Sequence, residues 1–143
     1  HMFECDFKNG SWQNPVIRPY GDLTISPSAK VFHYGQAVFE GMKAYRNDDG
    51  KVMMFRPMDN FARLNKSAER MCMPTIPQSL MMDALQELLK IDKDWVPKRK
   101  DSSLYIRPFM FATDEFIGVK PSETYRCMMF TCPVGPYYSL LLK

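Results

Sequence analysis

Residues 104–112 read LYIRPFMFA, and residues 124–132 read TYRCMMFTC. Both runs are rich in aromatic and long apolar residues. Their side chains alternate between two faces, as in a strand of a sheet that is covered on one face only. Runs of this length and composition are typical of strands rather than helices. We therefore expect two strands at the end of the chain, and these strands decide the fold.

Further strands are expected toward the N-terminus. Residues 3–8 form a strand-like run that ends at Asn9-Gly10, a dipeptide suited to a tight turn. Residues 41–46 and 51–56 flank the turn-rich tetrad NDDG and predict a hairpin. The prolines at 15, 19 and 27 exclude a long helix from residues 11–30, which we expect to be extended chain wrapped over the sheet.

Two helices lie between these strands. The first begins after Arg56-Pro57 and repeats apolar residues at three- and four-residue steps from Phe61 to Met71, before Pro74 ends it. The second covers about residues 79–92 and has an apolar stripe. This order of strands, two helices and further strands predicts an α+β domain, a two-layer sandwich of a mainly antiparallel sheet with helices on one side. We expect this domain to span residues 1–134 and an interdomain linker to begin at 135–143, where Gly135-Pro136 breaks the last strand.

Composition excludes several classes of protein. The 45% hydrophobic and 24% charged content is that of a globular domain, and no apolar run approaches the length of a membrane span. A net charge of +3 with one short basic run, at residues 98–100, does not predict nucleic-acid binding. The four cysteines form no C-x-x-C pair, and Cys127 and Cys132 should face opposite sides of their strand. Reduced cysteines and the lack of a secretory signal at the start of the sequence favour a cytoplasmic protein.

Common catalytic signatures are absent from the sequence. It contains no P-loop, no G-x-G-x-x-G, no H-E-x-x-H and no G-x-S-x-G, and its only histidines are His1 and His33. The usual zinc ligand sets cannot be assembled from these residues, so no metal site is expected. For His33 a structural role is favoured over that of a general base.

Tyr105 and Arg107 form the strongest local pattern. Two positions apart on a strand, they project from the same face about 7 Å apart. A guanidinium with a neighbouring phenol can hold a carboxylate, but an ion pair with an Asp or Glu on the same sheet face explains the pattern equally well. Arg63, next to the core-facing Leu64, reads by pattern alone as a solvated helix residue.

Several longer motifs resemble the branched-chain aminotransferases of fold type IV, which depend on pyridoxal phosphate. They cover nearly the whole chain in register: HYGQAVFEGMKAY (33–45), FRP (55–57), NFARL (60–64), SA (67–68), RMCMP (70–74), IDKDWVP (91–97), LYIRP (104–108) and CPVG (132–135). The segment DWVP at 94–97 is similar to the branch of the family that includes animal enzymes and some bacterial ones.

The resemblance implies roles for single residues. Arg63 matches the arginine that binds the cofactor phosphate, and Tyr34 and Phe39 match walls of the pocket for the branched side chain. Tyr105 and Arg107 match the pair that handles substrate carboxylates, including the distal carboxylate of glutamate. Val119 matches a loop residue that reaches the pocket of the partner subunit, which implies a homodimer.

The activity implied is amino transfer from leucine, isoleucine or valine to 2-oxoglutarate, giving a branched 2-oxo acid and glutamate. In the family, the Schiff-base lysine lies in a C-terminal domain that this chain does not contain. No catalytic residue is therefore expected here, and the fragment alone should be inactive. Lys43 is the tempting substitute, but the family has an ordinary basic strand residue at this position. The alternatives are a non-catalytic module that binds a small carboxylate, or another fold type IV enzyme, a D-amino acid transaminase or aminodeoxychorismate lyase.

Overall fold

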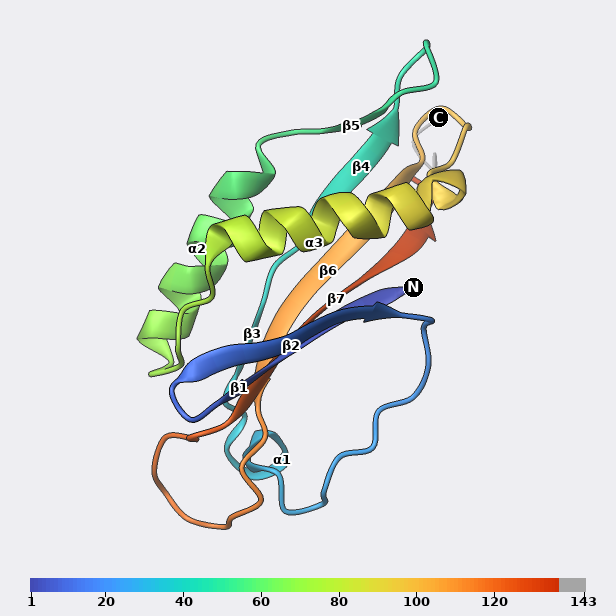
Figure 1. Ribbon diagram of the computed structural model, residues 1–143. Helices are drawn as coiled ribbons and strands as arrows, with labels where there is room; N and C mark the ends of the chain where they lie inside the picture. The colour runs from blue at the N-terminus through green and yellow to red at the C-terminus, as the bar shows by residue number, and fades with distance from the viewer. Residues whose placement is uncertain (137–143) are drawn as a thin grey trace, which may run out of the picture.

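The computed structural model describes residues 1–136 and has the expected α+β architecture (Figure 1). Seven strands form one antiparallel sheet in the order β2-β1-β7-β6-β4-β5, and β3 also pairs with β6. The strands are β1 (Met2–Lys8), β2 (Ser11–Arg18), β3 (Ala37–Phe39), β4 (Met42–Arg46), β5 (Val52–Met54), β6 (Ser103–Ala112) and β7 (Tyr125–Val134). The predicted fold class is thus confirmed.

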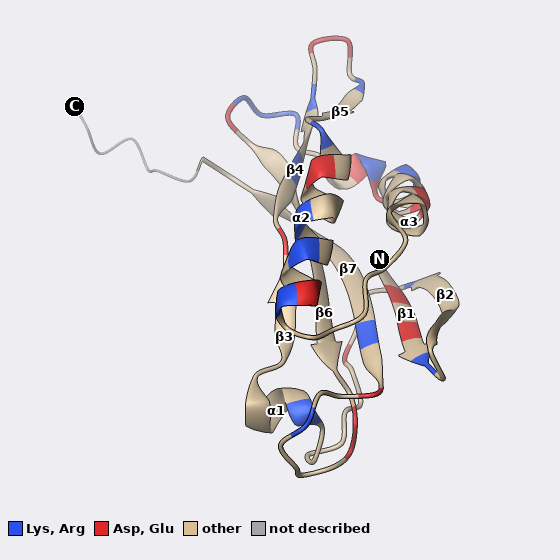
Figure 2. Cartoon of the chain, turned by 90° about the vertical axis from the view of Figure 1, so that its left-hand side faces the viewer, with Lys and Arg blue, Asp and Glu red and all other residues tan. Residues whose placement is uncertain are grey.

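Both long helices cover one face of the sheet. Helix α2 (Pro57–Arg70) begins with proline in its first turn, and α3 (Gln78–Ile91) crosses in front of the strands in Figure 1. Helix α1 (Lys30–Tyr34) and the 3₁₀ turn η1 (Lys93–Trp95) are short and were not expected from the sequence. Figure 2 shows acidic and basic residues side by side along α2, whereas the strands behind it carry few charges.

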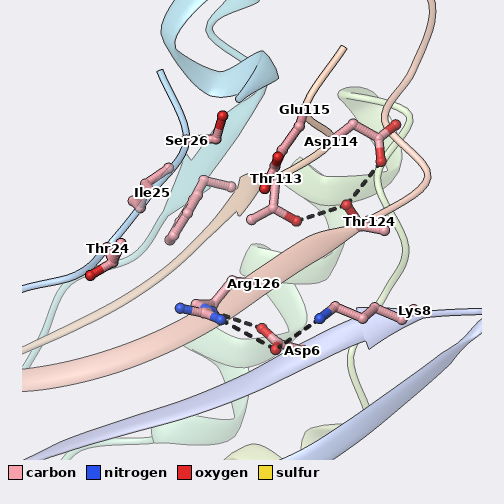
Figure 3. A pocket seen from close by; sticks show the side chains of 11 residues that line it. Asp6, Lys8, Thr24, Ile25, Ser26, Thr113, Asp114, Glu115, Thr124 and Arg126 are labelled. Carbon is pink, nitrogen blue, oxygen red and sulfur yellow. Dashed lines mark hydrogen bonds and ion pairs between the residues drawn. The ribbon is translucent and has the colours of Figure 1, made fainter. Parts of the chain in front are cut away.

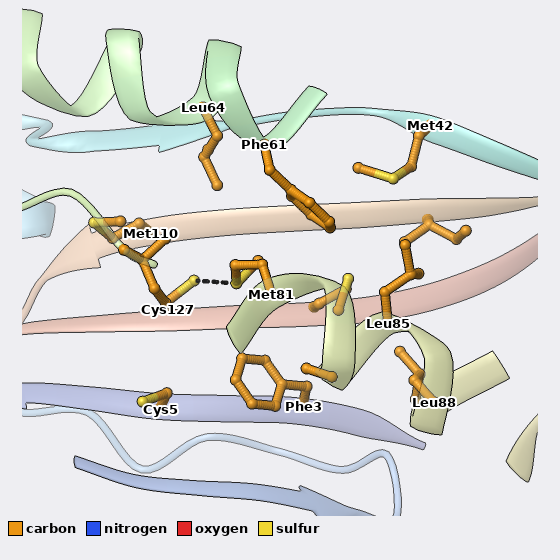
Figure 4. Close-up of a cluster of buried hydrophobic side chains, with 14 of the residues drawn as sticks. Phe3, Cys5, Met42, Phe61, Leu64, Met81, Leu85, Leu88, Met110 and Cys127 are labelled. Atoms are coloured by element: carbon orange, nitrogen blue, oxygen red, sulfur yellow. Dashed lines mark hydrogen bonds between the residues drawn. The ribbon is translucent and has the colours of Figure 1, made fainter. Parts of the chain in front are cut away.

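A buried cluster joins the helices to the sheet (Figure 4). The two helices contribute Phe61, Leu64, Ala68, Met81, Leu85 and Leu88, and the strands contribute Phe3, Cys5, Leu104, Ile106, Met110, Cys127 and Met129. These strand residues alternate with residues on the opposite, open face, as a sheet covered on one side requires. The predicted apolar stripe of the first helix extended one position too far, because Met71 lies after α2 and is exposed.

The first hairpin extends further than the sequence indicated. Asn9 and Gly10 both have positive φ, as the turn prediction required, but the following residues pair with β1 as strand β2 instead of only wrapping over the sheet. Pro15 is accommodated because β2 is an edge strand and needs to donate hydrogen bonds on one side only. From residue 19 to α1 the chain forms no helix or strand, and it includes a bend at Tyr20, a turn at residues 27–28 and an isolated bridge between Ala29 and Glu115.

One proline divides what would otherwise be a single strand. The pairing register of β3 with β6 continues unchanged into that of β4 with β6, but Glu40 and Gly41 between them belong to neither strand. The backbone N–H of Glu40 donates to the Pro108 carbonyl at 2.8 Å, and Pro108 has no N–H to return the bond. The ladder opens at this point, so a proline is tolerated in a central strand.

The limits expected for the domain stay a prediction. Strand β7 ends at Val134, and residues 137–143 of the expected linker lie outside the described residues. All four cysteines are free thiols, with Cys127 buried and Cys132 exposed, in agreement with their expected opposite orientations. Within residues 1–136, no helix is long and apolar enough to cross a membrane.

Candidate functional site

Three of the predicted site residues meet on the open face of the sheet. The Arg107 guanidinium donates through Nη2 to the Tyr105 hydroxyl at 2.8 Å. Its central carbon lies 4.5 Å from the centre of the Phe39 ring and 5.3 Å from that of Tyr105. Strand β6 therefore presents a phenol and a guanidinium together, and β3 adds an aromatic ring against which the cation packs.

The ion-pair alternative finds no partner in the structure. Among the described residues, no Asp or Glu forms a salt bridge with Arg107. The Nε of Arg107 is buried and has no hydrogen-bond acceptor within residues 1–136. The Nη1 nitrogen also has no acceptor among the described residues, and because it is not buried it can donate to an anionic group from outside them.

Gly41 lies directly beneath the Tyr105 hydroxyl. A β carbon at position 41 would overlap the hydroxyl oxygen, so the Tyr105 ring would have to move to admit a side chain there. The absence of a side chain in the gap between β3 and β4 thus makes room for the phenol. Because Tyr105 accepts the hydrogen bond from Arg107, Gly41 is also needed for the geometry of that pair.

An apolar hollow of about 290 Å³ adjoins Arg107. It is lined by Ala37, Val38, Phe39, Arg107, Phe109 and Phe130. The rings of Phe109 and Phe130 meet edge to face with their centres 5.8 Å apart. Such walls can take an aliphatic group but offer it no hydrogen bonds, while the guanidinium at the rim can hold an acidic group of the same ligand.

Arg63 has a partner that the sequence reading missed. Its Nε and Nη2 donate to the two carboxylate oxygens of Glu40, at 2.5 and 2.9 Å, in a side-on two-pronged ion pair. Glu40 is only 5% exposed, whereas the Arg63 side chain is 68% exposed on α2. Burial alone would raise the pKa of the Glu40 carboxyl, but hydrogen bonds from Arg63, Asn60 and the Gly41 N–H hold it below its usual value. The HYGQAVFEG motif contains Glu40, but nothing local in it indicates a partner 23 residues away.

Tyr34 and Val119 lie apart from this group. Tyr34 ends α1 and is 40% exposed, while Val119 is 94% exposed on the loop after β6, and neither lines the hollow. Their two segments are fastened together by Lys30, whose buried ammonium donates to the carbonyls of Gly118 and Lys120 at 3.2 and 2.7 Å. The structure therefore divides the predicted pocket residues into Phe39 near Arg107 and a second group of Tyr34 and Val119.

Two further candidates of the sequence analysis have clear positions. Lys43 is paired with Tyr105 across β4 and β6, so both side chains belong to the open face. His33 places Nε2 2.8 Å from the Pro27 carbonyl, which agrees with a structural role. Within residues 1–136, no group of three or more His, Cys, Asp or Glu residues is arranged to hold a metal ion.

A separate polar pocket of about 330 Å³ lies between β1, β7 and the loop after β6 (Figure 3). Its main charges are already paired, because Arg126 forms a two-pronged ion pair with Asp6 at 2.7 and 3.2 Å. Asp114 accepts hydrogen bonds from the Glu123 N–H and the Thr124 hydroxyl. These internal bonds pair Asp6, Arg126 and Asp114 with groups of the chain itself.

Comparison with known proteins relates the chain to one enzyme family. No family model matches the chain. Over 139 residues, 96% of its length, the chain is 55% identical to branched-chain-amino-acid transaminase 1 of Bacillus subtilis (strain 168). It is 48% identical over 144 aligned positions to branched-chain-amino-acid aminotransferase 2 of the same organism. The chain covers 39% and 40% of these proteins, so it spans about two fifths of the length of the curated relatives it matches.

Solved structures have the same fold. The Escherichia coli branched-chain amino acid aminotransferase matches 95% of this chain and 41% of its own with a TM-score of 0.69 at 24% identity. The enzyme of the archaeon Thermoproteus uzoniensis, solved with norvaline, matches 93% of this chain and 41% of its own with a TM-score of 0.66 at 21% identity. A further branched-chain amino acid aminotransferase, complexed with N-(5'-phosphopyridoxyl)-L-glutamate, matches 87% of this chain with a TM-score of 0.61 at 24% identity. These structures show the shared fold, and the two Bacillus subtilis relatives confirm the resemblance indicated by the sequence motifs.

Proposed function

We propose, from the homology of this chain to the branched-chain aminotransferases, that it supplies the substrate-facing small domain of such an enzyme. The whole protein would transfer the amino group of leucine, isoleucine or valine to 2-oxoglutarate. The observation that carries this proposal is the pairing of Arg107 with Tyr105 beside the hollow at Phe39. A guanidinium beside an apolar cavity suits ligands that combine a carboxylate with an aliphatic group.

The carboxylate would bind at Arg107. The Nη1 nitrogen is an accessible donor with no partner among the described residues, and the Tyr105 hydroxyl, which accepts its hydrogen bond from Arg107, can donate its own proton to an anion. Glutamate has a second, distal carboxylate where leucine has methyl groups. We assign the distal carboxylate to the Tyr105 and Arg107 pair, and the methyl groups to the walls of the hollow, Phe39 among them.

The cofactor would be pyridoxal 5'-phosphate, and Arg63 fits its phosphate. Glu40 occupies the Nε edge of the guanidinium, and among the described residues no acceptor is bonded to Nη1. A guanidinium presents donors in a fork that matches phosphate oxygens. When bound, the cofactor accepts and returns the amino group. The solved neighbour that is complexed with N-(5'-phosphopyridoxyl)-L-glutamate supports this assignment.

A homodimer would bring the second group of residues into use. Tyr34 and Val119 lie on two segments joined by Lys30, and Phe116 and Ile117 on the same loop are also exposed. Exposed apolar residues gathered on one loop are typical of interaction sites. We assign both Tyr34 and Val119 to the substrate pocket, with Val119 reaching that of a partner subunit, and we place the enzyme in the cytoplasm.

The chain by itself would be inactive, because the lysine that carries the cofactor would lie in the remaining part of the protein. Lys43, despite its place on the open face, would not replace it. Incubating this chain with pyridoxal phosphate and borohydride tests the point. A stable reduced adduct at a single lysine would contradict it.

The decisive assay uses the whole gene product with leucine and 2-oxoglutarate. We expect transamination, and we expect Arg107→Ala to impair glutamate turnover more than leucine binding, because only glutamate has the distal carboxylate. Arg99→Ala, in the exposed loop after η1, serves as a control that leaves both unchanged. Binding of 2-oxoglutarate without any turnover would favour a binding module, and turnover of D-amino acids would favour another fold type IV enzyme.

A further inference from the structure

Glu40 is a buried carboxylate placed at the break between β3 and β4. Its two oxygens receive four donors: Nε and Nη2 of Arg63, Nδ2 of Asn60 and the N–H of Gly41, the last two at 3.2 Å. A carboxylate that is 5% exposed needs this degree of hydrogen bonding to remain charged. Asn60 also donates to the Gly41 carbonyl at 3.3 Å, so the cluster connects α2 to the strand break.

The ion pair restricts the orientation of Arg63. An arginine side chain that is 68% exposed would otherwise sample many rotamers, and ordering it on binding a ligand would cost free energy. The side-on contact with Glu40 engages the Nε edge and leaves Nη1 directed away from the carboxylate. The guanidinium is therefore ordered before any anion arrives.

We propose that Glu40 is a positioning residue, which holds Arg63 in the orientation that receives the cofactor phosphate. This inference rests on the proposed function. Two opposing effects are at work, since the negative charge of Glu40 repels a phosphate while the fixed fork favours it. The burial of Glu40 and its four donors favour the second effect, because they hold the carboxylate and its partner in one geometry.

The experiment measures the dissociation constants of pyridoxal 5'-phosphate and of pyridoxal for the cofactor-free whole gene product, with and without Glu40→Gln. Glutamine keeps the size of the side chain but presents an amide N–H₂ where Arg63 needs an acceptor. Carboxylates that orient a ligating side chain contribute roughly 10–100-fold to affinity at metal sites, and we expect about a tenfold weaker phosphate ester here. The affinity for pyridoxal should not change, because it has no phosphate for Arg63 to bind.

Control variants separate positioning from folding. Glu87→Gln removes an exposed ion pair with Lys90 on α3 and should change neither dissociation constant. In an Arg63→Lys background, Glu40→Gln should have little further effect, because the fork it orients is gone. If Glu40→Gln fails to fold, a second measurement tests the same point in the cofactor-free wild type. This measurement is the rate at which the Nε proton of Arg63 exchanges with solvent. Slow exchange is expected, and exchange as fast as that of exposed Arg99 overturns the proposal.

The outcomes also distinguish this inference from the proposed function. If the wild type does not bind pyridoxal 5'-phosphate, the proposed function fails. If the wild type binds it but Glu40→Gln binds it equally well or more tightly, the function stands and the positioning role of Glu40 is refuted. An equal loss of affinity for pyridoxal and its phosphate ester would indicate a general disturbance of the site and would also refute that role.

Discussion

The Tyr105 hydroxyl lies so close to Gly41 that a β carbon at position 41 would overlap it and the ring would have to move. This contact links the strand break opposite Pro108 to the hydrogen bond between Tyr105 and Arg107. The two residues at the break act on opposite faces of the sheet. Gly41 makes room for Tyr105 on the open face, and Glu40 forms an ion pair with Arg63 of α2 on the face that the helices cover. The candidate site depends on this interruption as much as on its own side chains.

Gly41→Ala should displace the Tyr105 ring and disrupt its hydrogen bond with Arg107. Overpacking of this kind typically costs about 1–3 kcal/mol. We expect lower thermal stability of the whole gene product together with a higher KM for glutamate. Gly21→Ala is the matched control, because its added methyl would meet only the end of the Arg18 side chain at 3.8 Å. Equal behaviour of the two variants would show that the close contact has no consequence.

Asp6→Asn should make stability less dependent on pH. Burial raises the pKa of the Asp6 carboxyl, but the hydrogen bonds and charge of Arg126, with help from Lys8, lower it below its usual value (Figure 3). A pKa that is lower in the folded than in the unfolded chain contributes stability above the unfolded value of about 3.9. This contribution is lost as the pH falls through the folded-state pKa.

Urea unfolding measures this effect. Near neutral pH, the variant should be less stable by about 1.5–3 kcal/mol, the range for a hydrogen bond to a charged group. The difference between variant and wild type should shrink as the pH falls below about 4. Glu123→Gln, which removes an exposed pair with Lys120, should change stability by less than about 1 kcal/mol. A difference that is independent of pH would exclude the ion pair as its cause.

The buried thiols should resist alkylation. Burial raises the pKa of both Cys5 and Cys127, and neither thiol is accessible in the folded chain (Figure 4). Cys72 is exposed after α2 and should react with a short pulse of iodoacetamide at least about a hundredfold faster, because the buried thiols react only after local opening. Mass spectrometry of the digested protein measures each site. Labelling of Cys127 at the rate of Cys72 would contradict the predicted core.

Lys30→Met should release the loop after β6. The carbonyls of Gly118 and Lys120 would lose their charged donor, and hydrogen bonds from a charged group contribute about 1.5–3 kcal/mol each. We expect faster cleavage by chymotrypsin after Phe116, whose ring lies 5.5 Å from the Lys30 ammonium in the wild type. Lys66→Met, on the exposed face of α2, is the control. If both variants are cleaved at the same rate, the Lys30 contacts do not hold the loop.

Local patterns in the sequence determined most of the elements. Alternation predicted β6 and β7, the Asn9-Gly10 turn predicted the end of β1, and apolar spacing predicted α2 and α3, because these signals depend on backbone geometry within a few residues. The spacing of Tyr105 and Arg107 placed them on one face for the same reason. The motifs then indicated the family, which the comparisons confirm.

Tertiary structure decided the contacts that join distant segments. The pairing of Glu40 with Arg63 and the fit of Gly41 under Tyr105 depend on the register of β3 and β4 against β6 and on the docking of α2. Register is set by packing across strands, and no window of adjacent residues contains that information. For the same reason, the sequence could propose Arg63 as a phosphate ligand but could not identify the carboxylate that holds it.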